Sequence, residues 1–485
     1  MQRKDSPGWI RRVSDRYADA LLPSALLLLD YGMIVMAELL AYEMRRSWLP
    51  FSNSDFYIPN VYLYIIVPTI FLSYLHSSRA QLRSTPFWKM AQSVFWAVFY
   101  SLLTIVMLMY FGKVAEVVSR FFVGMTVLLS FPFLLTARYF FKDYINSHKL
   151  FQIPVLFVGA GKTAELVLES FDRDSGFGYR VIGFIDDHPI SKKLAKEFRI
   201  LGRFEHIERV ILLTKVQEVI ITVPGLSAED QVALVNRIQP LVKHVSFVPD
   251  IIGAPVGNIE VESLVDARLM LLKVKNNLAS WKNRALKRCF DIVMGLLLMP
   301  FILAVGLLLS LWIYLDDPGP VLFTQKRIGR KGEEFVCYKF RSMYQNADAM
   351  LENYLAKDPE ARKEWETYAK LRGDDPRVTR AGKWIRRYSL DELPQIINVI
   401  KGEMSLVGPR PYLPREAEAM GEYLSTIVVT VPGITGLWQI SGRNDIAFEG
   451  RLRLDAWYVR NWSVWMDIVY LLKTVKVVLC RKGAY

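Results

Sequence analysis

Two adjacent carboxylates, Asp391 and Glu392, follow a pair of arginines, Arg386 and Arg387, in a stretch whose residue types suit phosphate chemistry. Ser389, with Glu392 three residues later, fits a capping box at the start of a helix. Unpaired backbone N–H groups and the helix dipole would add positive charge at that point. We therefore expect a phosphate-binding site in which this charge lowers the pKa of both carboxylates and keeps them ionised.

The two carboxylates are predicted to have different roles. Adjacent residues on a helix point about 100° apart, so Asp391 and Glu392 are not expected to face each other as an acid–base pair. One of them would attack phosphorus while the other holds a divalent ion. The alternative is that both simply cap a helix, which would carry Pro394 in its first turns and end at Gly402.

Composition places part of this chain in lipid. The chain has 485 residues, enough for two or three domains, and 52% of them are hydrophobic. Lys and Arg total 61 against 48 Asp and Glu, a net charge of +13. Beside long apolar runs, this charge favours a membrane surface or a phosphate-rich substrate, and we expect no nucleic acid partner. The three cysteines and five histidines are too scattered for a disulfide framework, a zinc site or a His-ligated metal site.

The first 149 residues predict a four-helix transmembrane bundle. Four apolar segments of near-spanning length follow a basic start, at about 21–44, 58–76, 90–111 and 117–141. Asp30 and Glu38 are costly in lipid, so both should face the bundle interior. The distribution of Lys and Arg puts both ends of the bundle in the cytoplasm. The weaker alternative is a bundle of buried helices in a soluble protein.

Residues 150–278 predict a Rossmann-like α/β accessory domain. Short β-rich runs at 153–158, 181–185, 219–223 and 245–248 alternate with helical stretches, which favours a parallel sheet. The turn Gly159-Ala-Gly-Lys-Thr-Ala164 has the spacing of a dinucleotide fold, and Asp186 or Asp187 follows the next strand. A nucleotide-binding domain and a degenerate domain used for association both stay open.

Residues 279–485 contain a fifth apolar run, 292–315, with Pro300 in its interior. Its length is enough to span a bilayer. Basic residues on both flanks and four preceding spans instead favour a re-entrant membrane helix over 289–315, bent at Pro300, with both ends in the cytoplasm. This helix would anchor an α+β catalytic domain. The tail, 457–479, is either an interfacial amphipathic helix or an ordinary core helix.

Several ordered motifs stand in this last region. They are Lys287-Arg-Cys-Phe-Asp291, Lys339-Phe-Arg-Ser-Met343, Ser389-Leu-Asp-Glu-Leu-Pro394, Met404-Ser-Leu-Val-Gly-Pro-Arg-Pro411, and Pro432-Gly-Ile-Thr-Gly436 through Gly442-Arg-Asn444. Together they resemble the bacterial sugar transferase family, the monotopic phosphoglycosyl transferases. The bundle and the α/β domain in front resemble the long form of that family.

The resemblance implies an enzyme that transfers a hexose 1-phosphate, with galactose the expected hexose, from a UDP-sugar to undecaprenyl phosphate and releases UMP. This would start O-antigen, capsule or exopolysaccharide synthesis. Asp391 would be the nucleophile that forms a covalent phosphosugar, and Glu392 with Asp391 would hold Mg²⁺. The enzyme would lie in the bacterial inner membrane with its site facing the cytoplasm. The extra association-type domain makes a homodimer the expected oligomer.

Further site residues follow from the matched motifs. Arg410 lies between two prolines in a turn and is placed to bind phosphate, although it could be a structural turn arginine. The other residues expected to bind substrate or phosphate are Arg341, Arg386, Arg387, Gly442, Arg443 and Asn444. Those expected at the lipid phosphate or the membrane are Lys287, Arg288, Asp291 and Pro300.

Two functions of other classes compete with this interpretation. A membrane scaffold for polysaccharide assembly would explain the bundle and the α/β domain, but it would leave the charged motifs after residue 320 without a role. A membrane nucleotide-sugar dehydratase or epimerase would need a Tyr-x-x-x-Lys pair, a spacing that does not occur in the sequence.

Overall fold

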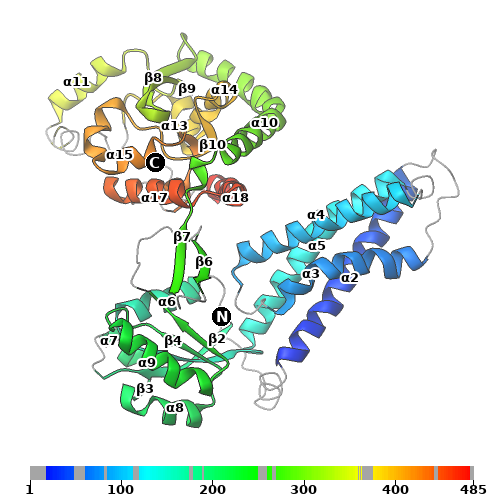
Figure 1. Cartoon of the computed structure of the whole chain (residues 1–485). Helices are drawn as coiled ribbons and strands as arrows, with labels where there is room; N and C mark the ends of the chain where they lie inside the picture. The colour runs from blue at the N-terminus through cyan, green and yellow to red at the C-terminus, as the bar shows by residue number, and fades with distance from the viewer. Residues whose placement is uncertain are drawn as a thin grey trace. The chain divides into compact units, whose positions relative to one another are not determined.

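The computed structural model describes residues 18–48, 60–80, 85–112, 119–173, 178–187, 191–249, 259–264, 269–358, 360, 362, 375–441 and 446–480. The chain forms two compact units, Met1–Ile252 and Gly253–Tyr485 (Figure 1). The boundaries predicted for three domains, at residues 149 and 278, stay predictions.

The first unit begins with a bundle of apolar helices. α2, α4 and α5 are long and apolar enough to cross a membrane, whereas the second predicted segment gives a shorter apolar helix over Tyr62–His76. That helix opens with a π-helical turn, η1, before α3 continues it. The bounds are α2 (Ala18–Trp48), η1 (Tyr62–Ile66), α3 (Val67–Ala80), α4 (Phe87–Phe111) and α5 (Arg120–Ser147).

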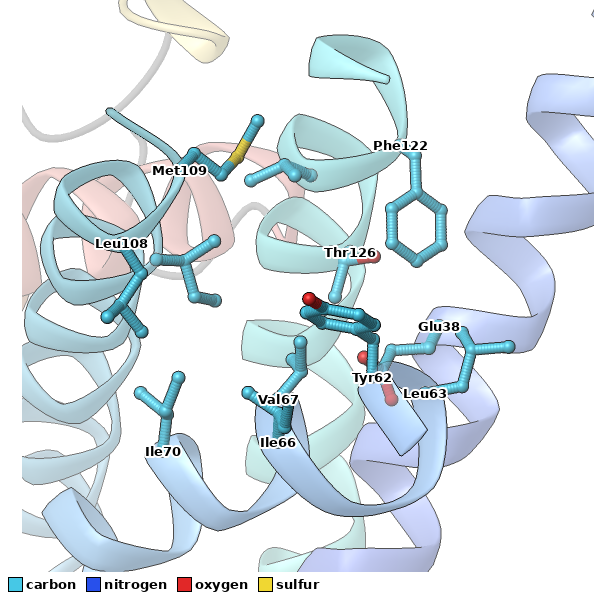
Figure 2. Close-up of a pocket in the computed structure, with 12 residues that line it drawn as sticks. Glu38, Tyr62, Leu63, Ile66, Val67, Ile70, Leu108, Met109, Phe122 and Thr126 are labelled. Carbon is cyan, nitrogen blue, oxygen red and sulfur yellow. The ribbon is translucent and has the colours of Figure 1, made fainter. Parts of the chain in front are cut away.

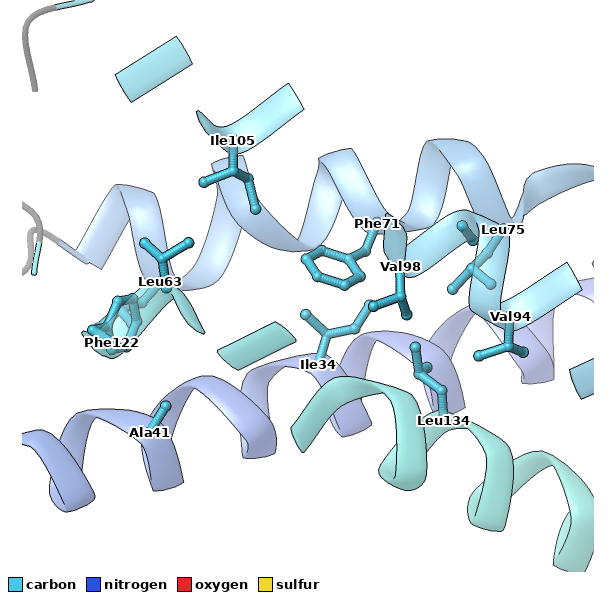
Figure 3. Packing of buried hydrophobic residues seen from close by; sticks show 12 residues of the cluster. Ile34, Ala41, Leu63, Phe71, Leu75, Val94, Val98, Ile105, Phe122 and Leu134 are labelled. Carbon is cyan, nitrogen blue, oxygen red and sulfur yellow. The ribbon is translucent and has the colours of Figure 1, made fainter. Parts of the chain in front are cut away.

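The bundle is apolar on its outside as well as in its core. Buried side chains from each of these helices, among them Ile34, Phe71 and Val98, form one apolar cluster (Figure 3). On the outside, Leu28 and Phe140 are 69% and 66% exposed. Large apolar side chains in such numbers are unfavourable in water and ordinary in lipid, so the surface of the bundle is that of a membrane protein.

Polar groups lie inside the bundle instead. Arg138 of α5 donates hydrogen bonds to both carboxylate oxygens of Asp30 on α2, at 2.8 Å from Nε and 2.6 Å from Nη2. Both side chains are fully buried, and so is Glu38. The prediction that Asp30 and Glu38 face the interior is confirmed.

The rest of the first unit is a parallel sheet with the strand order β3-β2-β1-β4-β5, as expected of a Rossmann-like fold. The strands are β1 (Ile153–Val158), β2 (Tyr179–Ile185), β3 (Ile200–Gly202), β4 (Glu218–Ile221) and β5 (His244–Phe247). The helices and turns are α6 (Lys162–Arg173), α7 (Lys192–Glu197), η4 (Phe204–His206), α8 (Ile207–Thr214), α9 (Ala228–Ile238) and η5 (Gln239–Leu241). Helices α8 and α9 cover one face and α6 and α7 the other, so the strands are apolar on both faces.

The second unit is mixed α and β. Its strands pair as β6 (Ile259–Leu264) with β7 (Leu269–Val274) and β8 (Leu322–Ile328) with β9 (Glu334–Phe340), both antiparallel, and β10 (Ser405–Val407) with β11 (Gly433–Thr435), parallel. Its longer helices are α10 (Trp281–Asp316), α11 (Ala347–Lys357), α13 (Arg380–Arg387), α14 (Ile396–Lys401), α17 (Phe448–Asn461) and α18 (Val464–Cys480). Its shorter ones are η7 (Asn277–Ala279), η8 (Arg330–Gly332), η9 (Leu390–Gln395), η10 (Pro414–Glu416), η11 (Glu418–Met420), α15 (Tyr423–Ile427) and α16 (Leu437–Ser441).

Helix α10 is apolar, exposed along its middle and packed on this unit at both ends. Near its start, Asp291 accepts hydrogen bonds from Ser405 Oγ at 2.9 Å and from the backbone N–H of Leu406 at 3.1 Å. Near its end, Leu309 and Ile313 pack in a cluster with side chains of β9 and α13. Between them lie exposed apolar residues such as Phe301, at 68%. The helix runs unbroken through Pro300, and the predicted bend there stays a prediction.

The start of α10 is held by a buried lysine. Lys287 Nζ lies 2.7 Å from Asp467 Oδ2 of α18 and donates to the carbonyl of Val407 at 2.9 Å. Asp467 also accepts from Tyr458 Oη at 2.7 Å and from Trp462 Nε1 at 2.9 Å. Because one face of α18 carries this buried carboxylate, α18 is a core helix on that face, while Leu472 and Val475 on the helix are exposed.

Replacing Lys287 with methionine should destabilise the protein, because it leaves Asp467 buried without its cation. The loss expected for breaking a buried pair is about 3–5 kcal/mol. Thermal unfolding in detergent should show a fall of several degrees in Tm. The control is Lys273→Met, whose ion pair with Glu262 is about half exposed on both sides and should change Tm little. Equal Tm values for the two variants would contradict this account.

Candidate functional site

A cleft of about 1070 Å³ in the second unit gathers charged side chains from distant parts of the sequence. Its charged lining consists of Arg327 from β8, Lys339 from β9, Arg341, Asp348 from α11, Arg386 from α13, Asp391 and Glu392 from η9, and Arg410. The predicted residues Asp391, Glu392, Arg341, Arg386 and Arg410 therefore share one cleft. With five cations against three carboxylates, the cleft suits an anionic ligand.

The β8–β9 hairpin supplies one wall. Phe323 lies opposite Lys339, and Gln325 opposite Cys337, in antiparallel register. Side chains two residues apart on a strand point to the same face, and so do directly opposed ones. Arg327 therefore lies on the same face as Lys339, which places both cations in the cleft.

The carboxylates lie on η9, a 3₁₀ turn, and the predicted capping box is wrong. Ser389 has a φ of 56°, in the left-handed region, and its side chain makes no capping hydrogen bond. The side chain of Glu392 instead accepts a hydrogen bond from Lys339 Nζ at 2.8 Å. Pro394 lies within η9, and Gly402, with a φ of 90°, ends α14; both were predicted.

Lys339 bridges the two carboxylates unequally. Its Nζ is 2.8 Å from Glu392 Oε1 and 3.9 Å from Asp391 Oδ2. Although burial opposes it, the attraction of Glu392 and Asp391 raises the pKa of this lysine. The ammonium group is thus held closely by Glu392, and Asp391 is the less committed of the two carboxylates.

Burial raises the pKa of Asp391 to about 6, and the neighbouring Glu392 carboxylate adds to the rise. Lys339 and Arg386 lower this pKa, but by less. The prediction that the positive surroundings lower it is therefore wrong, because desolvation of the charged form outweighs them. At pH 7 Asp391 is still mostly ionised, and its oxygen is more basic than that of an ordinary aspartate.

The arginines of the cleft are fixed by other groups. Arg386 Nε donates to Ser342 Oγ at 2.8 Å, and burial lowers the pKa of Arg386. Arg341 Nη1 lies 3.1 Å from Asp317 Oδ2, just after α10. Arg327 Nη1 donates to the carbonyl of Pro411 at 3.0 Å. Each guanidinium group is held in place before any ligand arrives, which lowers the ordering cost of binding.

Arg410 is positioned by contacts that the sequence did not reveal. Its guanidinium carbon lies 5.3 Å from the centre of the Trp438 ring, and that of Arg451 lies at the same distance. Its backbone N–H donates to Asp455 Oδ2 at 3.0 Å, and Tyr412 Oη donates to the same oxygen at 2.9 Å. Burial raises the pKa of Asp455 to about 7.

Other predicted site residues lie away from the cleft. Arg387 is exposed and does not line it. Lys287 and Asp291 are buried in the packing of α10, and Arg288 Nη2 donates to the carbonyl of Ile400 at 2.7 Å, at the end of α14. Pro300 is exposed on α10. The predicted residues Gly442, Arg443 and Asn444 lie outside the described residues, and all of these roles stay predictions.

Lys339, Arg327 and Trp438 were given no role from the sequence. The alternation of Phe335, Cys337 and Lys339 along a strand could have placed Lys339 on the same face as Arg327. Trp438 carries no such signal, because its position depends on packing by Arg410 and Arg451.

Asp391 and Glu392 fit a magnesium ion only together with a phosphate ligand. Among the described residues, no group of three or more His, Cys, Asp or Glu side chains could hold a metal. Mg²⁺ in phosphoryl-transfer sites typically uses one or two protein carboxylates and completes its shell with water and phosphate oxygens. Two carboxylates beside a cationic cleft meet that requirement.

Comparison with known proteins matches both parts of the chain. The profile of a family described as bacterial sugar transferase matches residues 282–481, which include the whole cleft lining, and that of a CoA-binding domain matches residues 80–249. The chain is 38% identical to an undecaprenyl-phosphate galactose phosphotransferase of Salmonella typhimurium over 71% of this chain and 72% of the relative. It is 38% identical to a UDP-galactose-lipid carrier transferase of Erwinia amylovora, over 76% of each chain. It is 30% identical to a UDP-glucose:undecaprenyl-phosphate glucose-1-phosphate transferase of Escherichia coli, over 70% of this chain and 71% of the relative.

The glycine turn of the α/β domain does not fit the pyrophosphate of CoA or of a dinucleotide. Gly159 has a φ of 103°, which favours glycine, and the next N–H, that of Ala160, donates to Asp186 Oδ2 at 2.6 Å. In a dinucleotide fold this turn faces phosphate. Here a carboxylate of the protein occupies the anion position, so no role for CoA is derived.

Replacing Lys339 with methionine should destabilise the protein more at high pH than at low pH. Without the ammonium group, two neighbouring carboxylates repel each other wherever both are ionised. Lys339 lowers the pKa of Asp391, which is about 6 in the wild type, so in the variant protonation of Asp391 relieves that repulsion already at a higher pH. The Tm deficit against wild type should therefore grow between pH 5 and pH 8, reaching the equivalent of about 1–3 kcal/mol. Lys326→Met, an exposed lysine on the same hairpin, is the control; a deficit independent of pH would contradict the bridging role.

Proposed function

Because the chain belongs to the bacterial sugar transferase family, we propose that it transfers a hexose 1-phosphate from a UDP-sugar to undecaprenyl phosphate and releases UMP. The protein is thus an undecaprenyl-phosphate hexose phosphotransferase that starts the synthesis of a surface polysaccharide. The observation that carries this proposal is Asp391, a half-buried carboxylate with a raised pKa in a cleft of fixed cations. The names of its relatives supply the class of sugar donor and the class of lipid acceptor.

Asp391 is the proposed nucleophile. Lys339 is closer to Glu392 than to Asp391 by about an ångström, at 2.8 Å against 3.9 Å. The carboxylate that is less firmly paired and more basic is the better nucleophile. An oxygen of Asp391 attacks the phosphorus that carries the sugar, and the bond from that phosphorus to the UMP oxygen breaks. UMP leaves with the electron pair, and the sugar phosphate stays on Asp391 as an acyl phosphate.

In the second step an oxygen of undecaprenyl phosphate attacks the same phosphorus. The bond to Asp391 breaks, the carboxylate is restored, and the product is a hexose linked to the lipid through a diphosphate. The covalent intermediate allows a water-soluble donor and a lipid acceptor to use one cleft in turn. They never have to be bound together, so the cleft needs to neutralise the charge of only one incoming substrate at a time.

The cations of the cleft stabilise the charge that these steps create. Arg386 attracts Asp391, and Arg410 and Arg327 also line the cleft. Fixed cations that face a reacting phosphoryl group cost no reorganisation during the reaction. A Mg²⁺ ion held by Asp391 and Glu392 with the donor phosphates would neutralise further charge.

We place the enzyme in the bacterial inner membrane, with the cleft facing the cytoplasm where nucleotide sugars are made. The packing of both ends of α10 on one unit supports a helix that enters the membrane and returns to the same face. In such a helix the exposed apolar middle lies in lipid, and Asp291 and Ile313 lie on the same side.

Galactose is the proposed hexose, since two relatives at 38% identity carry galactose in their names and one at 30% identity carries glucose. Release of UMP from a panel of UDP-sugars, with undecaprenyl phosphate and the purified membrane protein, tests the proposal. UMP release with UDP-galactose and with no other UDP-sugar of the panel would support it. No UMP release with any UDP-hexose would overturn the transferase function, and release with UDP-glucose only would overturn the choice of hexose.

Asp391→Asn should abolish the covalent step, because an amide cannot form the acyl phosphate. Wild-type protein incubated with radiolabelled UDP-sugar and no lipid should retain label on the chain, whereas the variant should not. The variant is close to isosteric, so its Tm should stay near that of wild type. Label on the folded variant would remove Asp391 as the nucleophile.

The rate of this labelling should fall as pH drops through about 6, the pKa of Asp391. A diphosphate diester such as a UDP-sugar does not titrate near pH 6. The fall in rate on the acidic side of the pH profile, its acidic limb, therefore reports a group of the enzyme. Glu392→Gln removes a charge that raises the pKa of Asp391, and the limb should therefore move to lower pH. Glu334→Gln, on an exposed carboxylate, should leave the limb in place. A limb near pH 4 in wild type would contradict the raised pKa.

A cysteine at Pro320, placed in a variant that lacks Cys289, Cys337 and Cys480, should report the membrane side of the end of α10. Pro320 is exposed, unlike Asp317, which pairs with Arg341. An impermeant maleimide added to intact cells should not label it, and permeabilised cells should give full labelling. Labelling in intact cells would show that α10 crosses the membrane.

A further inference from the structure

The bundle contains a second buried carboxyl group, and this one is not paired with a cation. Asp30 on α2 meets Arg138 in a two-point ion pair. Glu38, about two turns further along the same helix, is fully buried, and both of its carboxyl oxygens are without a hydrogen-bond partner among the described residues. A carboxyl group in a membrane bundle is costly unless a partner neutralises it, and such residues typically mark a site.

The buried basic side chains of the described bundle are engaged elsewhere. Arg45 Nε donates to Ser119 Oγ at 3.0 Å, and Lys142 Nζ donates to the carbonyl of Thr85 at 2.7 Å. Arg138 is held by Asp30. These three basic side chains of the described bundle are therefore held by groups other than Glu38.

A cavity of about 80 Å³ lies beside Glu38 (Figure 2). Glu38 reaches into it from α2, Tyr62 from η1, Leu108 from α4, and Phe122 and Thr126 from α5. The remaining lining is apolar: Leu63, Ile66, Val67, Ile70, Ile105, Met109 and Val123. At about 10–15 Å³ for each water, the volume exceeds that of a single trapped water.

Two further features are those of a binding site. The hydroxyl of Thr126 is also buried without a hydrogen-bond partner in the described structure, so the cavity holds a second unsatisfied polar atom. The π-helical turn η1 supplies three of the lining side chains, Tyr62, Leu63 and Ile66. Such turns are rare and are frequently found at functional sites. Leu108 is 52% exposed, so the cavity reaches the outer surface of the bundle.

We propose that this cavity binds an amphiphile that ends in an ammonium group. The ammonium group would meet the Glu38 carboxylate, and its three N–H donors match the unsatisfied oxygens of Glu38 and Thr126. The rings of Tyr62 and Phe122 add cation–π attraction, and the apolar walls take the hydrocarbon chain. An anionic amphiphile, including a lipid phosphate, gains no ion pair with Glu38. The site is therefore separate from the cleft at Asp391 and from its lipid acceptor.

The test uses the full-length protein in nanodiscs of phosphatidylcholine, with dodecylamine as the probe. Dodecanol and dodecanoate, which have the same chain length, are the comparison compounds. Dodecylamine should raise Tm saturably, and the other two should not. Glu38→Gln keeps the shape of the side chain and should weaken the amine effect roughly tenfold or more. Glu43→Gln, on the exposed face of the same helix, should retain it.

Several outcomes would overturn the proposal. These are an equal rise with dodecanol, a saturable rise with dodecanoate, or an unchanged response in Glu38→Gln. If Glu38→Gln fails to fold, labelling of wild-type protein by a hydrophobic carbodiimide replaces it. Mass spectrometry should find the adduct on Glu38, and dodecylamine but not dodecanol should reduce it at least several-fold. An adduct on other carboxyl groups only, or equal labelling with and without the amine, would also overturn the site.

Discussion

The contact between the Lys339 ammonium group and the carboxylates of Glu392 and Asp391 is the interaction on which the charged cleft depends. It joins the β8–β9 hairpin to η9, two segments that are more than 50 residues apart in sequence. Without the cation, two carboxylates on adjacent residues of a half-buried turn would repel each other. With it, Glu392 is paired with the ammonium group, and Asp391 keeps the pKa that its burial raises. The same contact thus holds the fold of the site and separates the roles of its two acids.

The bilayer imposes the second constraint, and the chain meets it in two ways. In the bundle, large apolar side chains cover the outside and the charged groups Asp30 and Arg138 pair inside. Among the described helices of the second unit, α10 is the one that is apolar and long enough to cross a membrane, and its ends are fixed to β10 and to α13. In the re-entrant arrangement proposed above, a domain fixed to both ends of this helix lies at the surface of the membrane. That position suits the proposed transfer from a soluble to a lipid substrate.

The sequence predicted those features that depend on local pattern. The β1 strand, the parallel sheet, the apolar helices and the inward-facing Asp30 and Glu38 follow from periodicity and from the cost of charge in lipid. The motifs indicated Asp391, Arg386, Arg341 and Arg410, which the fold brings into one cleft. What failed depended on distant contacts. The side chain of Glu392 bonds to Lys339 and not to the backbone at Ser389. Burial raises the pKa of Asp391 by more than the neighbouring cations lower it. Neither the lysine contact nor the depth of burial can be read from local residue spacing.

In both units, buried charged groups are paired with groups of opposite charge. The two carboxyl groups of α2 differ in this respect. Asp30 has a cation from the chain itself and so needs nothing further, which makes it a structural pair. Glu38 also has apolar surroundings, but it faces a cavity and not a cation. The hydroxyl of Thr126 in the same cavity likewise has no hydrogen-bond partner among the described residues. If the bundle served only as an anchor, a leucine at position 38 would pack as well and carry no cost of burial. A buried carboxyl group that no described residue pairs is costly in a lipid-embedded bundle, and a cation that enters the cavity beside Glu38 would offset that cost.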